Sequence, residues 1–406
     1  MIKKQLNAAF LLAGTAIGSG MISLPMVLAK FGIINSCLIM LAFSILTYLT
    51  ALIRSDLNLN SRAEATLKEV GNIFECSWAG KFGDLLLKIL SFALMAAYIS
   101  GGASIIDSFF ENIIPFHAIL ILFAVIIALI FLFASDFVSH INGVLFVVMF
   151  SVLIALIIVL FSCTTINVTS HQNIVPHQIN DIRLHEWTTL VPIIFTSFGF
   201  QGSIHSMTKL CNNDRSLIKN ACLWGSLIPA FVYMIWTASV LFVVCNTDAR
   251  FFSLMLEGKA TDVGELVRVL SHALLSTKFT ENIQNIVWFV SALAIFTSII
   301  GVGLALLDIF QEEWQLKKWK SVLFITIVPA MISMFVPNAF IRILNVSGII
   351  LSFIAIIVPV IISWKMQHRK TLKTHLLIRN DFVMAGVFIC GIVIIALGLF
   401  DLLLIS

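Results

Sequence analysis

The chain has 406 residues, of which 60% are hydrophobic and only 11% are charged. Soluble domains carry about 25% charged residues, so this composition excludes an ordinary soluble protein and indicates many membrane-spanning segments. The formal net charge is only +4, and no basic patch interleaved with aromatic residues occurs along the chain, so we expect no nucleic-acid partner.

Apolar runs separated by polar breaks predict an all-α integral membrane protein with about eleven transmembrane helices. The first run is longer than the apolar core of a cleaved signal peptide, so we expect it to remain as the first helix. No linker separates soluble domains, and we expect one transmembrane domain over residues 1–406. The predicted helices cover approximately residues 6–29, 32–54, 83–110, 116–134, 141–162, 188–208, 217–245, 283–310, 320–336, 340–364 and 381–404.

The placement of Lys and Arg near the helix ends predicts how the chain is oriented. Loops that stay in the cytoplasm carry an excess of these residues. With the N-terminus inside, most of them fall on the cytoplasmic side, among them Lys3, Lys4, Lys317 and Lys318. We therefore expect a multi-pass protein of the bacterial inner membrane with a cytoplasmic N-terminus. Because the number of helices is odd, the C-terminus is expected in the periplasm.

Two predicted helices carry glycines where a straight spanning helix would carry Leu or Ile. The first contains Gly14, Gly18 and Gly20, and the sixth contains Gly199 and Gly202. Glycine costs roughly 1 kcal/mol against Ala in a helix interior, and unwound backbone is tolerated in a membrane only inside protein or along a cavity. An unwound helix offers N–H groups that suit a carboxylate and carbonyl groups that suit a cation. Close helix packing through small residues is the alternative explanation.

The two breaks fall at corresponding places in two halves that start in opposite orientations. Helices one to five cover residues 6–162, and helices six to ten cover residues 188–364. This arrangement predicts an inverted repeat of five plus five helices, with an extra eleventh helix over residues 381–404. Paired interruptions of this kind point to the binding site of a transporter. The connections 163–187 and 246–282 are long enough to hold short surface helices.

Four segments carry a resemblance to a known family. They are Ala13–Pro25, Ala97–Gly102, Ile194–Ser203 and Gly301–Asp308. On these segments the chain resembles the hydroxy and aromatic amino acid permeases, and within them the bacterial tyrosine-specific and tryptophan permeases. The resemblance covers the whole chain and implies the LeuT-type fold, in which helices one and six are interrupted around the substrate.

The resemblance also implies a substrate site, carried over by position. Its residues are Thr15, Ala16, Ser19 and Gly20 of the first helix, Tyr98 of the third, and Ser197, Phe198, Gly199, Phe200 and Gln201 of the sixth. Tyr98 combines an apolar ring with a hydroxyl able to bind a carboxylate. Phe200 is expected to stack on an aromatic substrate. Gln201 stands where the tyrosine permeases tend to have His, which leaves the preferred aromatic side chain open.

The coupling ion is expected beside a pair of hydroxyls in the eighth helix. Thr297 and Ser298 match the place where LeuT-type sodium symporters join two hydroxyls to backbone carbonyls around Na⁺. The resemblance places those carbonyls at Gly14, Ile17 and Ala294. Oxygen ligands alone suit a hard cation. The alternative is that each hydroxyl only bonds the carbonyl one turn earlier in its own helix.

The family is usually described as proton-driven, which leaves H⁺ as the other coupling ion. Proton-coupled relatives often carry a Lys in the fifth helix, where this chain has Met149. Methionine cannot carry a proton, so this departure favours Na⁺. Should the ion be H⁺, His205 and Asp308 are the candidates for a proton relay, because ionisable groups inside a membrane are costly and usually functional.

These features predict an ion-coupled symporter that imports an aromatic amino acid, tyrosine first, by alternating access around the two breaks. The alternatives are a permease for tryptophan or another amino acid, and an amino acid sensor of the same fold that does not transport. An enzyme and a bound cofactor are not expected, since no cluster of His, Glu and Asp has metal or acid–base spacing. The expected partners are the small-molecule substrate and membrane lipid.

Overall fold

The structure is a computed structural model of the whole chain. It describes all residues except 1, 19, 62–64, 111–112, 134, 168–183, 261, 276–283, 313, 337–338, 368–379 and 406. Throughout the described residues the regular secondary structure is helical.

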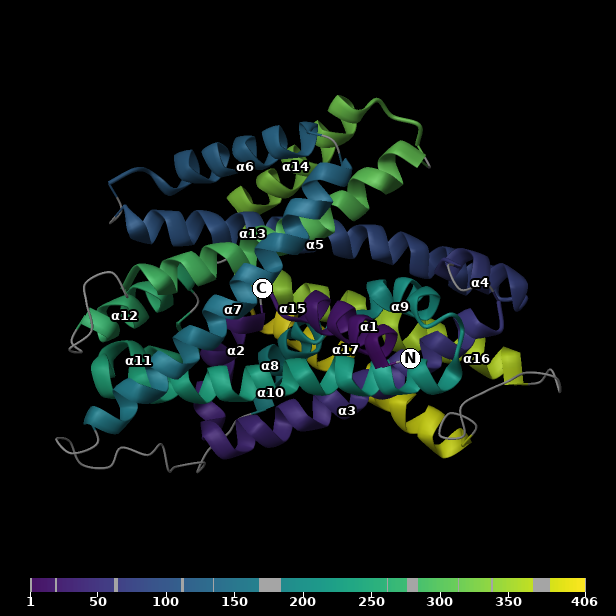
Figure 1. Cartoon of the computed structure of the whole chain (residues 1–406), viewed down its shortest axis with the longest axis horizontal. Coiled ribbons are helices and arrows are strands. Elements are labelled where there is room, and N and C mark those ends of the chain that lie inside the picture. The colour runs from purple at the N-terminus through teal and green to yellow at the C-terminus, as the bar shows by residue number, and fades with distance from the viewer. Residues whose placement is uncertain are drawn as a thin grey trace.

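Figure 1 shows how the helices are arranged. The first part of the chain forms α1 (Ile2–Ala16), α2 (Gly20–Leu28), the 3₁₀ turn η1 (Ala29–Phe31), α3 (Gly32–Leu59), α4 (Leu67–Ile73), α5 (Ser77–Phe109), α6 (Phe116–Leu132) and α7 (Ser135–Asn167). The second part forms α8 (Leu184–Ser197), the 3₁₀ turn η2 (Gln201–Ser203), α9 (Ile204–Leu210), α10 (Arg215–Thr247), α11 (Ala249–Glu257), α12 (Val263–Leu275) and α13 (Gln284–Glu312). The chain ends with α14 (Lys318–Phe335), α15 (Ala339–Ser352), the π-helical turn η4 (Phe353–Ile357), α16 (Val358–Gln367) and α17 (Asp381–Ile405).

Each of the predicted transmembrane segments is helical, and the differences lie at the ends. The third predicted helix begins earlier, at Ser77, and the second ends later, at Leu59. The polar end of α3 continues the helix because its side chains are buried against other parts of the protein. Arg54, for example, donates a hydrogen bond to the carbonyl of Ala65 (3.0 Å). The short surface helices expected in residues 246–282 are present as α11 and α12, whereas residues 168–183 of the other connection lie outside the described residues.

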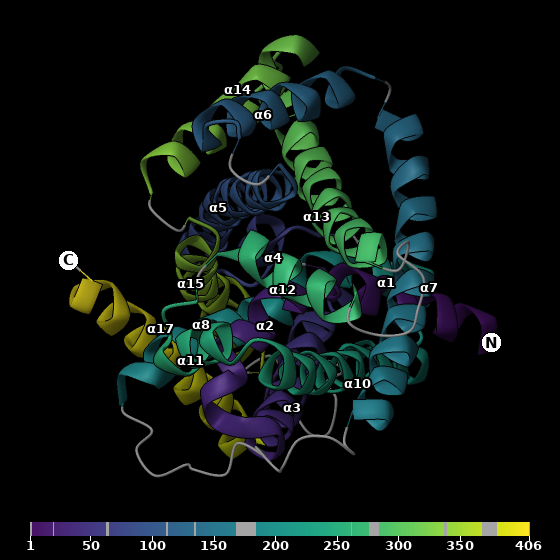
Figure 2. The same cartoon turned by 90° about the vertical axis from the view of Figure 1, so that its left-hand side faces the viewer.

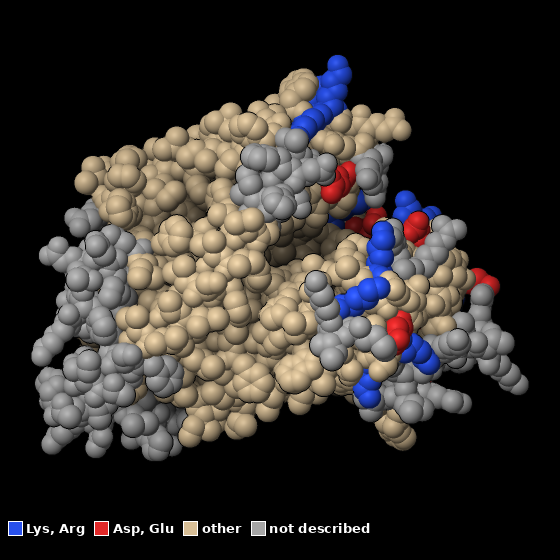
Figure 3. Space-filling model, in the orientation of Figure 1, with Lys and Arg blue, Asp and Glu red and all other residues tan. Residues whose placement is uncertain are grey.

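The helices present a mostly apolar surface of the kind a bilayer requires. By length and composition, seven helical stretches of the described chain are long and apolar enough to cross a membrane, and Phe116–Leu132 and Gly143–Val159 are shorter apolar helices. Figure 3 shows the same property on one face, where the Lys, Arg, Asp and Glu of the described residues gather near one end and uncharged residues form most of the remaining described surface. Many large apolar side chains are exposed along these helices, which is the arrangement expected of lipid-facing surfaces.

Two groups of helices surround the interrupted ones. Helix α10 packs along α1 and α3, whereas α5 packs against α13, α14 and α15. Figures 1 and 2 show α6 and α14 at one side of the molecule and α3 with α10 at the other, with α1, α2, α8 and α15 between them. The buried core is divided accordingly, because α1 contributes to one apolar cluster and α2 to the other. The interruptions therefore lie at the centre of the molecule.

Candidate functional site

The first interruption separates α1 from α2. Helix α1 ends at Ala16, and the last regular bond of this part runs from the Ile17 N–H to the Ala13 carbonyl (2.9 Å). The Met21 N–H then bonds the Gly18 carbonyl (3.1 Å) at the start of α2. The last carbonyls of α1 lack partners within the helix and can accept from elsewhere. This is the unwinding that the glycines of the first helix predict; Ser19 itself lies outside the described residues.

The second interruption separates α8 from α9. Helix α8 ends at Ser197, and the Gly199 N–H closes a tight turn onto the Thr196 carbonyl (2.9 Å). A Cβ atom on Gly199 would lie 2.8 Å from that carbonyl, so the turn requires glycine here. After η2, the chain resumes a helix at Ile204. Both interrupted helices of the prediction therefore open their backbone in mid-span.

Tyr233 of α10 joins the two interruptions. Its hydroxyl lies 2.7 Å from the carbonyl of Ala16 and 3.1 Å from the carbonyl of Ser197, and its side chain is fully buried. Gly20 lies directly beside it, because a Cβ there would be 2.5 Å from the hydroxyl oxygen and 2.7 Å from the Cβ of Ser197. The structure thus brings together Ala16, Gly20 and Ser197, three residues of the predicted substrate site.

A second polar contact links the interruptions on a more open side. The hydroxyls of Thr15 and Ser203 lie 2.8 Å apart, and Thr15 also donates to the Leu11 carbonyl (2.8 Å). Thr15 is exposed, and a Cβ added to Gly202 would meet nothing within 4 Å. Figure 3 shows the surface hollowed near the middle of the molecule. Access to the breaks is thus more open on the Thr15 side than along α2, whose described residues are almost all buried.

The predicted aromatic residues fall into two groups. Phe198 meets the Tyr233 ring edge to face, with 5.5 Å between centroids, and shares an apolar cluster with Tyr98. Phe200 is fully buried in the other cluster, together with Ala16. Phe198, rather than Phe200, is therefore the ring beside the joined helix ends. The side chain of Gln201 turns towards α3, where its amide donates to the Thr50 hydroxyl (3.3 Å).

The predicted ion-binding residues come together in part. A Cβ on Gly18 would lie 2.5 Å from the Ser298 hydroxyl, so the first break rests directly on α13. Thr297 donates to the Leu293 carbonyl (2.9 Å) and Ser298 to the Ala294 carbonyl (2.8 Å). Each hydroxyl donates its proton to a carbonyl of its own helix, so the lone pairs of its oxygen remain able to face a cation. These are also the bonds that the alternative explanation predicts, so Na⁺ at this pair stays a prediction.

Two further residues complete the surroundings of these hydroxyls. Met149 of α7 lies beside Thr297, with its sulfur 4.0 Å from the hydroxyl oxygen. Gly14 is predicted to contribute a carbonyl. It packs against the Phe146 ring, because a Cβ on Gly14 would lie 2.9 Å from a ring carbon. The position at which proton-coupled relatives often carry Lys is thus held by a buried thioether next to the predicted ion site.

Comparisons with known proteins identify the family of the chain. The sequence profile of the tryptophan/tyrosine permease family matches residues 1–398. The chain belongs to this family. It is therefore a multi-pass membrane protein of a bacterial permease family, and the prediction of a transporter rather than an enzyme is confirmed.

Individual relatives cover nearly the whole chain. "Tyrosine-specific transport system 1" of Haemophilus influenzae is 26% identical over 97% of this chain and 96% of its own length. "Glutamine transporter 2" of Aliivibrio fischeri is 26% identical over 92% of each chain. The "Tryptophan-specific transport protein" of Pseudomonas aeruginosa is 24% identical over 90% of this chain and 87% of its own.

A solved structure establishes the fold. The crystal structure of MhsT in complex with L-phenylalanine superimposes with a TM-score of 0.66 over 97% of this chain and 98% of that one, at 11% identity. MhsT has the LeuT fold, so the LeuT-type fold that the resemblance implied is confirmed.

The proton-relay candidates of this permease lie on α9 and α13. His205 of α9 and Asp308 of α13 are both exposed, and a ring nitrogen of His205 lies 3.1 Å from the Ser206 hydroxyl. Exposed groups exchange protons with solvent readily, but neither contacts the Tyr233 hydroxyl or the Thr297–Ser298 pair in any hydrogen bond described above. Their role as a relay stays a prediction.

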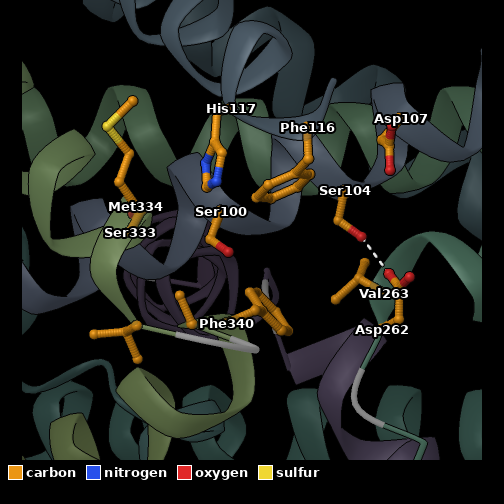
Figure 4. Close-up of a pocket in the computed structure, with 12 residues that line it drawn as sticks. Ser100, Ser104, Asp107, Phe116, His117, Asp262, Val263, Ser333, Met334 and Phe340 are labelled. Carbon is orange, nitrogen blue, oxygen red and sulfur yellow. Dashed lines mark hydrogen bonds between the residues drawn. The ribbon is translucent and has the colours of Figure 1, made fainter. Parts of the chain in front are cut away.

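A separate pocket of about 420 Å³ lies elsewhere in the permease (Figure 4). Its wall on α5 is formed by Ser100, Ser104 and Asp107, which at 100° per residue lie on the face opposite Tyr98. Ser104 donates to Asp262, whose carboxylate also caps the N-terminus of α12 by accepting from the Gly264 N–H (2.9 Å). None of the predicted substrate residues lines this pocket.

Sequence reasoning missed Tyr233 and Ser203, the residues that join the two interruptions. For Tyr233 a signal was present: it is one of only three tyrosines in the chain and falls in the middle of an apolar helix. For Ser203 no local signal existed, because its partner Thr15 is 188 residues away in sequence.

Proposed function

We propose that this permease is an ion-coupled symporter that imports an aromatic amino acid, with tyrosine as the first substrate to test. The observation that carries the proposal is the meeting of two interrupted helices, whose carbonyl ends at Ala16 and Ser197 converge on one buried hydroxyl. Carbonyl ends suit the ammonium of an amino acid, and the N–H groups that begin α2 suit its carboxylate. The side chain would lie against the rings of Phe198 and Tyr98.

Several relatives support an aromatic substrate, since their names specify tyrosine or tryptophan. One relative is named for glutamine, so a substrate with a polar side chain is the alternative to test. The buried rings near the joined helix ends favour an aromatic side chain over a polar one, because a glutamine amide would need hydrogen-bond partners in an apolar surrounding.

Alternating access would work by rocking the interrupted helices against the group built on α5 and α13. The exposed Thr15–Ser203 contact and the buried α2 support a form open on the side of α1 and α9. With the N-terminus in the cytoplasm of an inner-membrane protein, this is the inward-facing form. Substrate and ion together would lower the free energy of the rearrangement, and the ion gradient would set its direction.

For the coupling ion we propose Na⁺ at the Thr297–Ser298 pair. The support is the oxygen donor set beside Gly18 and the presence of Met149 instead of an ionisable side chain. The residues that would hold the ion are Ser298, Thr297 and the carbonyls of the first break. The ion would lie between Gly18 and α13, apart from the Ala16 carbonyl that Tyr233 already bonds.

The decisive experiment measures uptake of radiolabelled tyrosine into proteoliposomes under an inward Na⁺ gradient, and separately under a pH gradient. We expect accumulation with Na⁺, and inhibition by unlabelled tryptophan and phenylalanine but not by glutamine. Accumulation with the pH gradient alone would replace Na⁺ by H⁺ and direct attention to His205 and Asp308. Binding without accumulation under either gradient would favour a sensor. Preferential inhibition by glutamine would reject the aromatic substrate.

A further inference from the structure

The carbonyl ends of the two interrupted helices converge on a single donor. Helices α1 and α8 end at Ala16 and Ser197, and both terminal carbonyls lie within 3.1 Å of the Tyr233 hydroxyl. Each helix C-terminus carries a partial negative charge of about half an electron, so two such ends in one place repel each other unless something positive lies between them. A hydroxyl has one proton, which these two carbonyls share.

This position is shielded from water and closely packed. Tyr233 is fully buried, and Phe198 covers its ring edge to face. A Cβ on Gly20 would lie 2.5 Å from the hydroxyl oxygen, so there is no room for a side chain. Without solvent to screen them, unpaired carbonyls here would cost free energy comparable to a lost buried hydrogen bond each. The hydroxyl proton is therefore the group that allows the two ends to approach.

Helix α10 holds the first interrupted helix at a second point, one turn further on. Pro25 has no N–H, so the Met21 carbonyl one turn before it lacks its helical partner. The indole N–H of Trp236 donates to that carbonyl instead. Tyr233 and Trp236 lie three residues apart on the same face of α10 and thus contact the carbonyl end of α1 and the first turn of α2, respectively.

We propose that Tyr233 positions the two interrupted helices relative to each other, its hydroxyl proton supplying the positive end that a bound cation would otherwise supply between Ala16 and Ser197. Tyr233 is thus a positioning residue, and the test of it by amino acid uptake rests on the proposed function. It follows that a coupling ion has no place at this point of the wild-type protein. Shortening Tyr233 should create one.

The first test removes the proton and keeps the ring. Tyr233→Phe should raise KM for the amino acid roughly tenfold, the scale of one lost buried hydrogen bond, with a smaller change in kcat because the rocking helices keep their packing. An unchanged KM would overturn the proposal. So would a loss confined to kcat, since the substrate-binding ends would then be positioned without the hydroxyl.

The second test needs no substrate. Tyr233→Ser leaves a space at the two carbonyl ends that water can enter, where the two carbonyl oxygens and water suit Na⁺ or Li⁺. We expect NaCl and LiCl, compared with choline chloride at equal ionic strength, to raise the melting temperature of this variant more than that of the wild type. Subtracting the wild-type shift removes any ion bound at Thr297 and Ser298. An equal shift in the two proteins would overturn the proposal.

Trp236→Phe is the matched control. Like Tyr233→Phe, it removes a buried hydrogen-bond donor of α10, here the indole N–H that bonds the Met21 carbonyl. That carbonyl is not at the C-terminal end of a helix. We expect lower thermal stability without an added response to Na⁺ or Li⁺; an equal added response would show that the effect is general loosening and would reject the inference. The proposed function has a separate test, because it fails if the wild type accumulates no amino acid. The thermal-shift comparison uses no substrate and is unaffected by that result.

Discussion

Gly20 begins α2 directly beneath the Tyr233 ring, and the hydrogen in place of its side chain lets the two interrupted helices approach. An added Cβ would lie 2.5 Å from the hydroxyl oxygen and 2.7 Å from the Cβ of Ser197. These are distances that real Cβ atoms do not adopt, so either α2 or α10 would have to move. The joined helix ends tolerate no extra atom at this residue.

We therefore expect Gly20→Ala to weaken amino acid binding at least about tenfold, because the displaced Tyr233 would release one or both carbonyl ends. Equilibrium binding of radiolabelled tyrosine to the purified protein measures this. Gly301→Ala is the matched control, since a Cβ there meets nothing within 4 Å. Binding by Gly20→Ala that equals binding by the control would remove Gly20 from the site.

Glycine spacing predicted where the backbone opens but not what fills the opening. Gly18, Gly20 and Gly199 stand out in apolar segments because a straight helix disfavours them. Tyr233 contacts Ala16 across 217 residues of sequence, and no local pattern encodes such a pairing. The orientation of Gln201 towards Thr50 was likewise invisible, because it depends on how closely α3 approaches α9.

Helix α17 is attached to the rest of the fold by a buried carboxylate. Asp401 accepts hydrogen bonds from the hydroxyls of Thr188 (2.9 Å) and Thr189 (2.6 Å) on α8, and from the Asn345 amide (2.9 Å) on α15. One side chain thus ties the extra helix to an interrupted helix and to the tenth predicted span. The apolar sequence of α17 predicted a helix, but only the packed structure shows that Asp401 holds it in place.

Asp401→Asn should lower the melting temperature, with a destabilisation of about 1–3 kcal/mol, because its amide N–H₂ would face the Asn345 amide donor. Thermal unfolding in detergent measures the change. Asp381→Asn alters the same helix at its exposed first turn and should have a much smaller effect. Equal melting temperatures for the two variants would contradict an anchoring role for Asp401.

Across the whole molecule, the predicted ion site lies where the two helix groups meet. Gly18 belongs to the interrupted helix beside α10, and Ser298 belongs to α13 beside α5. A cation held between them would bind tightly only while the groups are in contact, and its binding free energy is thereby linked to the rearrangement. The resemblance to LeuT-type transporters made this arrangement predictable, since it implies that helices one and eight lie against each other. The identity of the ion depends on distances that sequence does not fix.

Thr297→Ala combined with Ser298→Ala should abolish the dependence of tyrosine uptake on Na⁺, because the two hydroxyl oxygens would be missing from the donor set. Uptake measured over a range of external Na⁺ concentrations tests this. Ser291→Ala, two turns earlier on the same helix and also buried, is the control and should retain the dependence. A sodium response that survives in the double variant would place the ion elsewhere.

The bond from Trp236 to the Met21 carbonyl also bears on how the protein is made. During synthesis the first interrupted helix enters the membrane with a proline gap and an open break, while the helix that satisfies both is still unmade; 215 residues separate the two partners. Until α10 arrives, those carbonyls must find temporary partners such as water or insertion machinery. The first interrupted helix is therefore complete only after α10 has been made, because backbone groups without partners in a membrane are costly.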